Sequence, residues 1–249
     1  MAADELELKG NWKQHGMESA FDHQPSERLD LADKYLDYRS LLWQLAIYNF
    51  FSYWLRNHDR VVDIACGAGH TSHMLSRLLP HGLIWGLDCD ASVIRRAKER
   101  YRSPNLIFMV QDMVTFREPA DVDCIVSADS IEHLSRADGE AFVSNCVRAL
   151  RPDGICIITT PLYRANRSEN RQSVHRHEYT YIGFKRLLQG YFSRVAIFGR
   201  RDEMIYFGEP QLYRTMVAVC HYPRRLKDEE RTDNGHNGVC GRILGKAPT

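Results

Sequence analysis

The chain has 249 residues, 44% of them hydrophobic, and its 33 Lys and Arg residues nearly balance 32 Asp and Glu residues, for a formal net charge of +1. This length and hydrophobic content are enough to bury one substantial core, and nothing in them requires a second domain. The near-zero net charge excludes a global field that would attract nucleic acid or a membrane surface. We therefore expect a globular protein whose specificity comes from local sites.

The sequence also bears on the compartment in which the protein works. Its seven cysteines form no CxxC pair, so we interpret them as reduced thiols of a cytoplasmic protein. No basic segment followed by an apolar one stands at the N-terminus, and we expect no signal peptide. The most apolar stretch, between Arg39 and Arg56, has only sixteen residues and contains Gln44 and Asn49. It is too short and too polar for a membrane span.

We expect three segments along the chain. Residues 1–28 are polar and are predicted to form a flexible arm, and residues 223–249 are charged and glycine-rich and are predicted to form a disordered tail. Residues 29–222 would form a single domain, whose first part, 29–57, is rich in aromatic side chains. Apolar stripes of this kind usually pack against a core, but the segment could also fold over a functional site as a lid.

A glycine turn follows the first expected strand. The apolar run at 61–65 has strand character, and after it come Gly67, Gly69 and a helical pattern that includes Leu75 and Leu78. Such a turn lets the backbone pass close to a ligand and points free N–H groups of the helix at it. On its own the pattern is weak, because glycines also occur at ordinary tight turns.

An acidic residue strengthens this pattern. The second apolar run, 83–87, is followed by Asp88, nineteen residues beyond Gly69. An acid at the end of the second strand of such a unit is placed to accept hydrogen bonds from both hydroxyls of a ribose. The turn and the acid together predict a ligand that contains adenosine. A dinucleotide-binding turn usually has a third glycine where this chain has Ser72, so NAD is disfavoured.

A helix is expected after Asp88, with Ser92 as its capping residue. Its apolar positions have helical spacing. Its outward positions carry four cations, Arg95, Arg96, Lys98 and Arg100. We interpret these cations as a solvated helix face.

Three stretches together resemble class I S-adenosylmethionine-dependent methyltransferases: residues 61–69, residues 86–88 and Leu150-Arg151-Pro152-Asp153-Gly154. The likeness covers about residues 40–220, in the order that this family uses. It implies an α/β fold in which a Rossmann-like, seven-stranded, mostly parallel sheet has helices on both faces. It also implies an enzyme whose cofactor is S-adenosylmethionine. The last two strands, at 194–198 and 213–220, would form the antiparallel edge of the sheet.

The resemblance implies a set of residues for the methyl-donor site. Asp112 follows the third expected strand, 106–110, and matches the family's acid that accepts a hydrogen bond from the adenine amino group. Its alternative role is to cap the next turn. The predicted donor site consists of Asp63, Cys66, Gly67, Gly69, Asp88, Cys89, Gln111, Asp112, Met113 and Ala128.

A second group of reactive side chains follows the fourth expected strand, 123–127. Asp129, Glu132 and His133 provide two carboxylates and an imidazole within five residues, and in a helix they would share one face. His133 could act as a general base on an acceptor hydroxyl, because imidazole titrates near neutral pH. The group could instead bind a divalent cation such as Mg²⁺, which lowers the pKa of the acceptor. A purely structural alternative is that Glu132 and His133 begin a helix.

This segment is similar to the carboxylate-x-x-Glu-His pattern of quinone-biosynthesis O-methyltransferases and of small-RNA 2′-O-methyltransferases, which have Glu at the position of Asp129. In the small-RNA enzymes a histidine of a His-rich segment completes the metal shell, and His177 is the residue that we match to it. In sugar and quinone methyltransferases the same place lines the acceptor pocket. The predicted catalytic residues are His133, Glu132 and His177. The predicted metal ligands are Asp129, Glu132, His133 and His177.

A long loop at 161–176 contains Arg164, Arg167 and Arg171 against a single acid, Glu169. Long irregular loops beside a ligand crevice are usually functional. These arginines could bind a phosphate or carboxylate of the acceptor, or they could be solvated.

The resemblance predicts transfer of a methyl group to an oxygen of a small molecule, such as a sugar or phenolic hydroxyl of a specialised metabolite or glycan. The alternatives are RNA 2′-O-methylation, small-molecule N-methylation and a non-catalytic S-adenosylmethionine-binding protein. A nucleic-acid partner is the less favoured expectation, because the sequence contains no recognised RNA-binding module. A homodimer is left open.

Overall fold

The computed structural model describes residues 38–117, 119–165, 175–201 and 204–224. The expected arm at 1–28, most of the expected tail, and Arg167 and Arg171 lie outside the described residues. None of the helices that the structure describes is long and apolar enough to cross a bilayer.

An eight-stranded sheet forms the centre of the fold, in the order β3-β2-β1-β4-β5-β8-β6-β7. The strands are β1 (Arg60–Ile64), β2 (Leu83–Asp88), β3 (Leu106–Val110), β4 (Val122–Ser127), β5 (Leu150–Pro161), β6 (Phe192–Arg201), β7 (Met204–Tyr206) and β8 (Thr215–Pro223). The first five strands pair in parallel. Most residues of β1 and β4 are apolar and buried, as expected of strands covered on both faces of the sheet.

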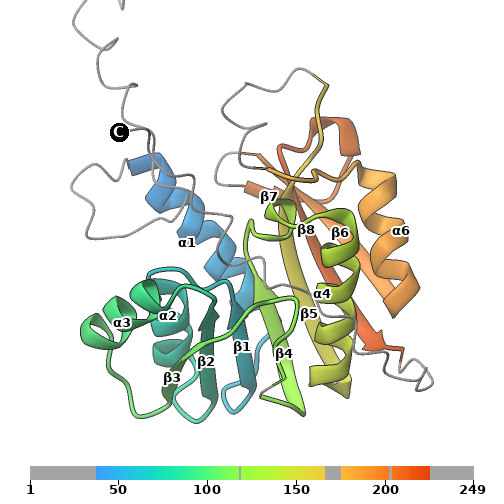
Figure 1. Cartoon of the computed structure of the whole chain (residues 1–249). Coiled ribbons are helices and arrows are strands. Elements are labelled where there is room, and N and C mark those ends of the chain that lie inside the picture. The colour runs from blue at the N-terminus through green and yellow to red at the C-terminus, as the bar shows by residue number, and fades with distance from the viewer. Residues whose placement is uncertain (1–37, 118, 166–174, 202–203, 225–249) are drawn as a thin grey trace, which may run out of the picture.

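Helices cover both faces of this sheet (Figure 1). The helices are α1 (Tyr38–Ser52), α2 (His70–Leu78), α3 (Ala91–Arg100), α4 (Arg136–Ala149) and α6 (Tyr181–Tyr191), with short 3₁₀ helices η1 (Ile131–His133) and η2 (Pro210–Leu212). On one face, Phe51 of α1 and Leu75 of α2 pack against Val61 of β1. On the other face, Phe142 of α4 and Phe184 of α6 join a cluster with Val62. This arrangement confirms the expected Rossmann-like fold.

The C-terminal half of the sheet has one strand more than the seven expected. An eighth strand is present because residues 204–206 fold back on the end of β6 as a three-residue hairpin partner. The last two expected strands, at 194–198 and 213–220, correspond to β6 and β8, which pair antiparallel with each other as expected. Since β8 pairs antiparallel with both β5 and β6, β6 runs parallel to β5 and β8 lies inside the sheet. Six consecutive residues of β8, from Thr215 to Cys220, are buried, as an interior strand requires.

The parallel strands bring their carboxyl ends to one edge of the sheet. Because β1 pairs with β2 on one side and with β4 on the other, the segment after β1 lies between the ends of those two strands. Ligands of open α/β sheets bind in the crevice outside these carboxyl ends. The fold therefore places the glycine turn, Asp88 and residues 128–133 around one crevice.

Candidate active site

The glycine turn has the backbone conformation that its residues require. Gly67 and Gly69 have φ of +54° and +82°, in the left-handed region that glycine adopts without strain. A Cβ on Gly69 would lie 2.6 Å from the ring of Phe108 and 2.9 Å from the Cβ of Ala97, so this glycine also allows close packing. A Cβ on Gly67 would meet no atom of the described residues within 4 Å. As far as these residues go, the space above Gly67 is open to a ligand.

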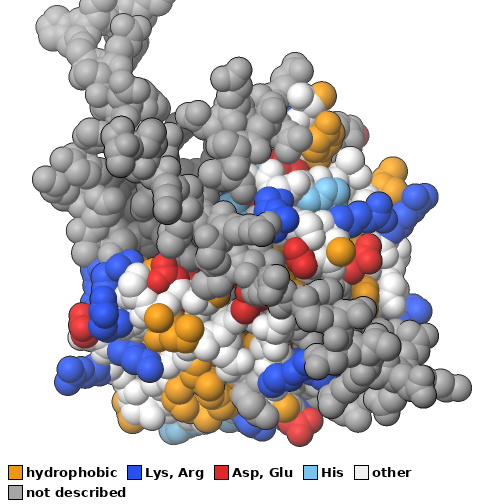
Figure 2. All heavy atoms as spheres, in the orientation of Figure 1, with side chains coloured by type: hydrophobic (Ala, Val, Ile, Leu, Met, Phe, Trp, Pro, Cys, Tyr) orange, Lys and Arg blue, Asp and Glu red, His pale blue; other side chains and the backbone are white. Residues whose placement is uncertain are grey.

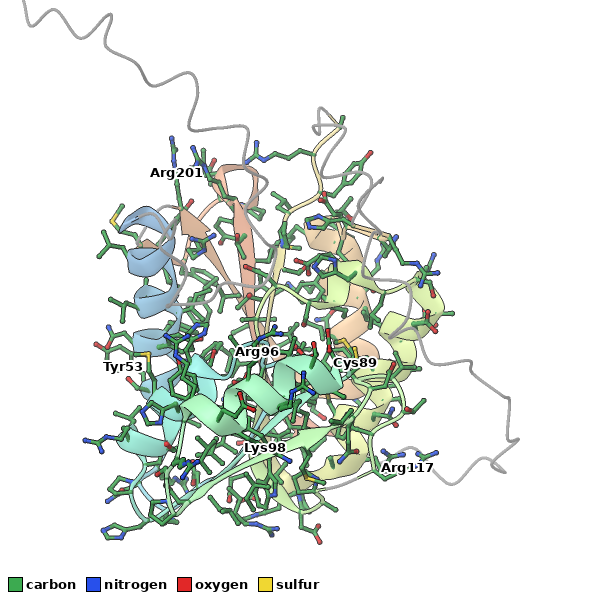
Figure 3. All side chains as sticks on the ribbon, turned by 60° about the vertical axis from the view of Figure 1, so that its left-hand side comes forward. Tyr53, Cys89, Arg96, Lys98, Arg117 and Arg201 are labelled. Atoms are coloured by element: carbon green, nitrogen blue, oxygen red, sulfur yellow. The ribbon has the colours of Figure 1, made fainter. Side chains whose placement is uncertain are left out.

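Asp88 closes the turn from the neighbouring strand. Its Oδ2 accepts a hydrogen bond from the backbone N–H of Gly67 at 3.0 Å, and its Oδ1 accepts one from the N–H of Asp90 at 3.0 Å. Asp88 is 5% exposed. Asp90, rather than the expected Ser92, caps α3, because its side chain accepts from the N–H groups of Ser92 and Val93. Cys89 lies between these two acids, at the junction of β2 and α3 (Figure 3).

Asp63 lies beneath the turn and is almost completely buried. Burial raises the pKa of its carboxyl to about 7; the hydrogen bond from Ser72 lowers it and the charge of Asp88 raises it further. Ser72 Oγ donates to Asp63 Oδ2 at 2.7 Å. Ser72, which stands where a dinucleotide-binding turn has its third glycine, thus holds the side chain of Asp63 through this hydrogen bond. A positively charged ligand above the turn would favour the ionised carboxyl.

Helix α1 reaches the turn through Tyr48, a contact that the sequence did not indicate. The Tyr48 hydroxyl lies 3.2 Å from Nε2 of His70 and forms a short hydrogen bond with Thr71 Oγ1. Burial raises the pKa of the phenol, and the neighbouring Asp63 and Cys66 raise it further. The first turn of α2 is thus covered by α1. We considered residues 29–57 as a lid, and residues 29–37 of that segment lie outside the described part of the chain.

Asp112 occupies the position expected for the adenine contact and also caps the following turn. Its Oδ1 accepts from the N–H of Val114 at 2.7 Å, and its carbonyl accepts from the N–H of Phe116 at 2.8 Å. The N–H of Gln111 donates to the carbonyl of Asp88 at 3.0 Å, which joins this turn to the end of β2. Met113 follows in the same turn. The alternative role as a cap is therefore present, and the adenine contact stays a prediction.

The second predicted group forms an acidic pair beside β5, in which Glu132 is buried and Asp129 is half-buried. Asp129 has φ of +45°, and its Oδ1 accepts from Thr159 Oγ1 at 2.8 Å. Thr160 Oγ1 donates to Glu132 Oε2 at 2.9 Å, and Glu132 is 1% exposed. Burial raises the pKa of both carboxyls; Arg200 opposes the shift at Asp129, and Asp129 adds to the shift at Glu132. The segment is a single 3₁₀ turn, not the α-helical face that we considered.

Two histidines approach this acidic pair. Glu132, His133 and His175 each offer one potential ligand atom, and these atoms lie within 4.8 Å of one another, close enough that the group could hold a metal ion. The rings of His133 and His175 are perpendicular, with centroids 5.1 Å apart. Nδ1 of His175 lies 2.6 Å from Oε1 of Glu178. A carboxylate on one imidazole nitrogen is the arrangement that usually orients a metal-binding histidine.

His177 and Asp129 are not part of this group. The ring of His177 packs edge-on against Tyr179, with centroids 4.5 Å apart, and its N–H donates to the carbonyl of Glu132 at 3.0 Å. His177 therefore holds the backbone under Glu132, whereas His175 places its side chain beside it. The structure thus replaces His177 with His175 in the candidate ligand set. Both histidines lie within the same His-rich segment, and sequence spacing alone did not separate them.

Cations and aromatic rings surround the neighbouring ends of β5, β6 and β8. Arg164 Nη2 donates to the carbonyl of Tyr213 at 2.7 Å, and Arg200 Nη2 donates to Thr215 Oγ1 at 2.9 Å. The ring of Tyr213 lies 5.5 Å from that of Tyr206. Of the arginines expected to bind an anionic acceptor, only Arg164 lies among the described residues.

Comparison with known proteins agrees with this architecture. The family model described as "Methyltransferase domain" matches residues 61–154, from β1 to the start of β5. Residues 61–154 thus match a methyltransferase domain, and the described part of the chain has the class I methyltransferase fold. The chain is 29% identical over 124 residues to a probable S-adenosylmethionine-dependent methyltransferase of Mycolicibacterium smegmatis, covering 44% of this chain and 46% of the relative. It is 30% identical over 105 residues to a ubiquinone biosynthesis O-methyltransferase of Cupriavidus pinatubonensis, covering 41% of each.

Solved structures extend the likeness of the methyltransferase domain beyond the matched segment. The PH0226 protein of Pyrococcus horikoshii superposes with a TM-score of 0.61 at 20% identity, covering 79% of this chain and 95% of that one. The methyltransferase domain of a bacterial Hen1 superposes with a TM-score of 0.57 at 22% identity, covering 72% and 99%. At these identities the likeness establishes the fold. The chain spans about half or less of the length of the curated relatives that it matches.

Proposed function

We propose that this chain transfers the methyl group of S-adenosylmethionine to an oxygen of a small-molecule acceptor. The observation that carries the proposal is the position of the glycine turn between Asp88 on one side and the Glu132–His133–His175 group on the other. A donor whose ribose binds Asp88 and whose chain crosses Gly67 would direct its sulfonium toward the end of β4. The reacting methyl would then face the second group.

The donor side of the crevice supports this assignment. The open space above Gly67 and the carboxylate of Asp88 suit a ribose, and Cys66, Gly69, Cys89, Gln111, Asp112, Met113 and Ala128 lie on the segments around them. Asp63 would face the positively charged part of the donor, because its carboxyl is buried under the turn. Tyr48 would cover the donor and exclude water, and exclusion of water strengthens the electrostatic interactions inside the site.

On the acceptor side, the side chains of Glu132, His133 and His175 are of the kinds that bind a divalent cation. Burial and the neighbouring Asp129 disfavour the charged form of Glu132, and a cation held with His133 and His175 would relieve that cost. When bound, such a metal would fix the acceptor oxygen and lower its pKa. Glu178 would orient His175, and Thr160 would orient Glu132. Without metal, His133 would instead accept the proton of the acceptor hydroxyl.

Cations near the crevice favour an acceptor that carries negative charge. Arg200 is close enough to Asp129 to lower the pKa of that carboxyl, and Arg164 lies at the end of β5. A small anionic acceptor could bind these two side chains without the extended basic surface that RNA requires. RNA 2′-O-methylation and N-methylation are the competing reaction classes.

The experiment follows the label of ¹³C-methyl S-adenosylmethionine in a metabolite extract and in an RNA extract. Methoxy and N-methyl carbons have different ¹³C shifts, so NMR identifies the acceptor atom directly. We expect a methoxy signal in the metabolite extract, dependent on added Mg²⁺ or Mn²⁺ and lost in His175→Ala. A methoxy signal that survives chelation but is lost in His133→Ala would favour the metal-free base. Label on nitrogen or only on RNA would contradict the proposal, and donor binding without any labelled product would favour a non-catalytic binding protein.

A further inference from the structure

The sheet ends at β3 with one edge of that strand unpaired by any other strand that the structure describes. The N–H of Ile84 donates to the carbonyl of Asn105 at 2.9 Å, and the N–H of Gln111 donates to the carbonyl of Asp88 at 3.0 Å. The odd-numbered residues from 105 to 111 therefore direct their backbone groups toward β2. Since successive residues of a strand alternate in direction, Phe108 and Val110 direct their N–H and C=O groups away from the sheet.

The sequence of this edge strand, Leu-Ile-Phe-Met-Val, lacks two features that often prevent another strand from pairing, charged side chains and proline. Ile107 is 42% exposed and Val110 is 50% exposed. An open groove of about 540 Å³ lies beside the first half of the strand and is lined by Lys98 of α3, by the loop that follows α3 and by residues 106–108 of β3. Figure 2 shows hydrophobic side chains gathered on the lower left face, with Lys and Arg side chains to their left.

Cations border the groove on the side of α3. Lys98 and Arg102 line the groove itself, and no acid does. Arg95, Arg96 and Arg100 are also exposed, and Glu99 is the single acid between residues 95 and 102. Figure 3 shows Arg96 and Lys98 on the outer side of α3. The cations that the sequence suggested to be a solvated helix face therefore stand beside an exposed, apolar strand edge.

We propose that β3 is a docking edge for an acidic β-strand of a partner protein. The partner's backbone would pair with Phe108 and Val110, its apolar side chains would cover Ile107, and its carboxylates would face Lys98 and Arg102. Strand addition of this kind takes its affinity from main-chain hydrogen bonds and its specificity from side chains. A second copy of this chain fits poorly, because two α3 helices would bring cations against cations. This inference does not depend on the proposed methyl transfer.

The test uses the full ¹⁵N-labelled chain and a capped peptide that alternates Glu with Val and Ile, compared with the same peptide in which Lys replaces Glu. We expect the acidic peptide to slow amide hydrogen exchange of Phe108 and Val110 by about tenfold or more, and the lysine peptide to have no such effect. The double variant Lys98→Glu and Arg102→Glu should weaken acidic-peptide binding about tenfold or more. Arg186→Glu, an exposed cation on α6 at the far end of the sheet, should leave binding unchanged.

A second variant tests main-chain pairing while the cations stay in place. Val110→Pro removes an outward-facing N–H, and proline is tolerated on the free side of an edge strand. It should keep the thermal midpoint close to that of the wild type and lose the peptide response. An equal response to both peptides, a response centred on other amides, or an unchanged response in Val110→Pro would overturn the proposal. Slow exchange of Phe108 and Val110 already in the free chain would also overturn it, because the edge would then be covered by this chain itself or by a second copy.

Discussion

The carboxylate of Asp88 accepts a hydrogen bond at 3.0 Å from the backbone N–H of Gly67, which lies 21 residues earlier in the chain. The acid that is expected to bind the ribose thus also holds the turn that would pass under it. The two parts of the donor site form one unit across β1 and β2. Substitutions in either part should therefore weaken donor binding. Measurements of stability and of binding should distinguish them from substitutions that only destabilise the fold.

The two glycines of the turn provide such a separation. Gly69→Ala should destabilise the fold by roughly 2–4 kcal/mol, because its methyl group would overlap Phe108 and Ala97 in addition to the strain of a positive φ. Gly67→Ala should cost only about 1 kcal/mol of strain but should weaken donor binding, since its methyl group would enter the open space. Urea denaturation gives the first effect and calorimetry the second. Equal losses of stability in the two variants would contradict this division of roles.

The raised pKa of Asp63 predicts that the free energy of unfolding decreases as the pH rises from 4 to 7. With a folded-state pKa of about 7, above its value in the unfolded chain, the folded protein keeps this proton while the unfolded chain releases it. The destabilisation develops across that window, reaches at most roughly 4 kcal/mol and stays constant at higher pH. Asp63→Asn should remove this part of the slope, so that its stability relative to the wild type increases from pH 4.5 to 7.5. Parallel urea midpoints for the two proteins across this range would show that Asp63 ionises normally.

Metal removal should distinguish the two neighbouring histidines. After treatment with a chelator, adding Mn²⁺ at about one hundred times its dissociation constant should stabilise the wild type by about 2.7 kcal/mol. His175→Ala should lose this stabilisation, because His175 belongs to the candidate ligand group with Glu132 and His133. His177→Ala is the matched control and should keep it. A metal response that persists in His175→Ala, or that disappears only in His177→Ala, would return His177 to the ligand set.

The contact between α1 and the donor turn can be measured on its own. Tyr48→Phe removes a buried hydroxyl that bonds Thr71 and His70, and should cost about 1–2 kcal/mol of unfolding free energy. Donor affinity should also fall, because the first turn of α2 loses its cover. Tyr53→Phe is the control, since Tyr53 is 78% exposed at the end of α1. If the two variants have the same urea midpoint, α1 is not held by Tyr48.

Local patterns were sufficient to predict the secondary structure around the glycine turn. The strand of Val61 and Val62, the turn at Gly67 and Gly69, and Asp88 follow one another within a single unit, so spacing along the sequence determines their positions in space. The C-terminal half depends on pairing between distant segments. The position of β8 between β5 and β6 could not be predicted from the sequence pattern of these strands. A buried strand is apolar whether it runs parallel or antiparallel to its neighbours.

The acceptor side shows the same limit at the level of single residues. Glu132 and His133 are adjacent to a strand end and could be identified from the sequence. The choice between His175 and His177 depends on which side chain lies beside Glu132. The sequence cannot decide this, because residues two apart lie on the same side of an extended chain. Tyr48 could not be assigned to the donor turn for a similar reason, since many aromatic residues of the same helix had equivalent spacing.

Binding of S-adenosylhomocysteine, measured by calorimetry on the wild type, Asp88→Ala and Asp153→Ala, tests the donor site directly. We expect one molecule per wild-type chain with a dissociation constant in the micromolar range, and affinity at least about one hundred times lower in Asp88→Ala, which loses both ribose bonds and the bond to Gly67. Asp153 is an exposed acid at the start of β5, and its removal should leave binding unchanged. A wild-type chain that does not bind S-adenosylhomocysteine, or an Asp88→Ala variant that binds it as tightly, would contradict the account.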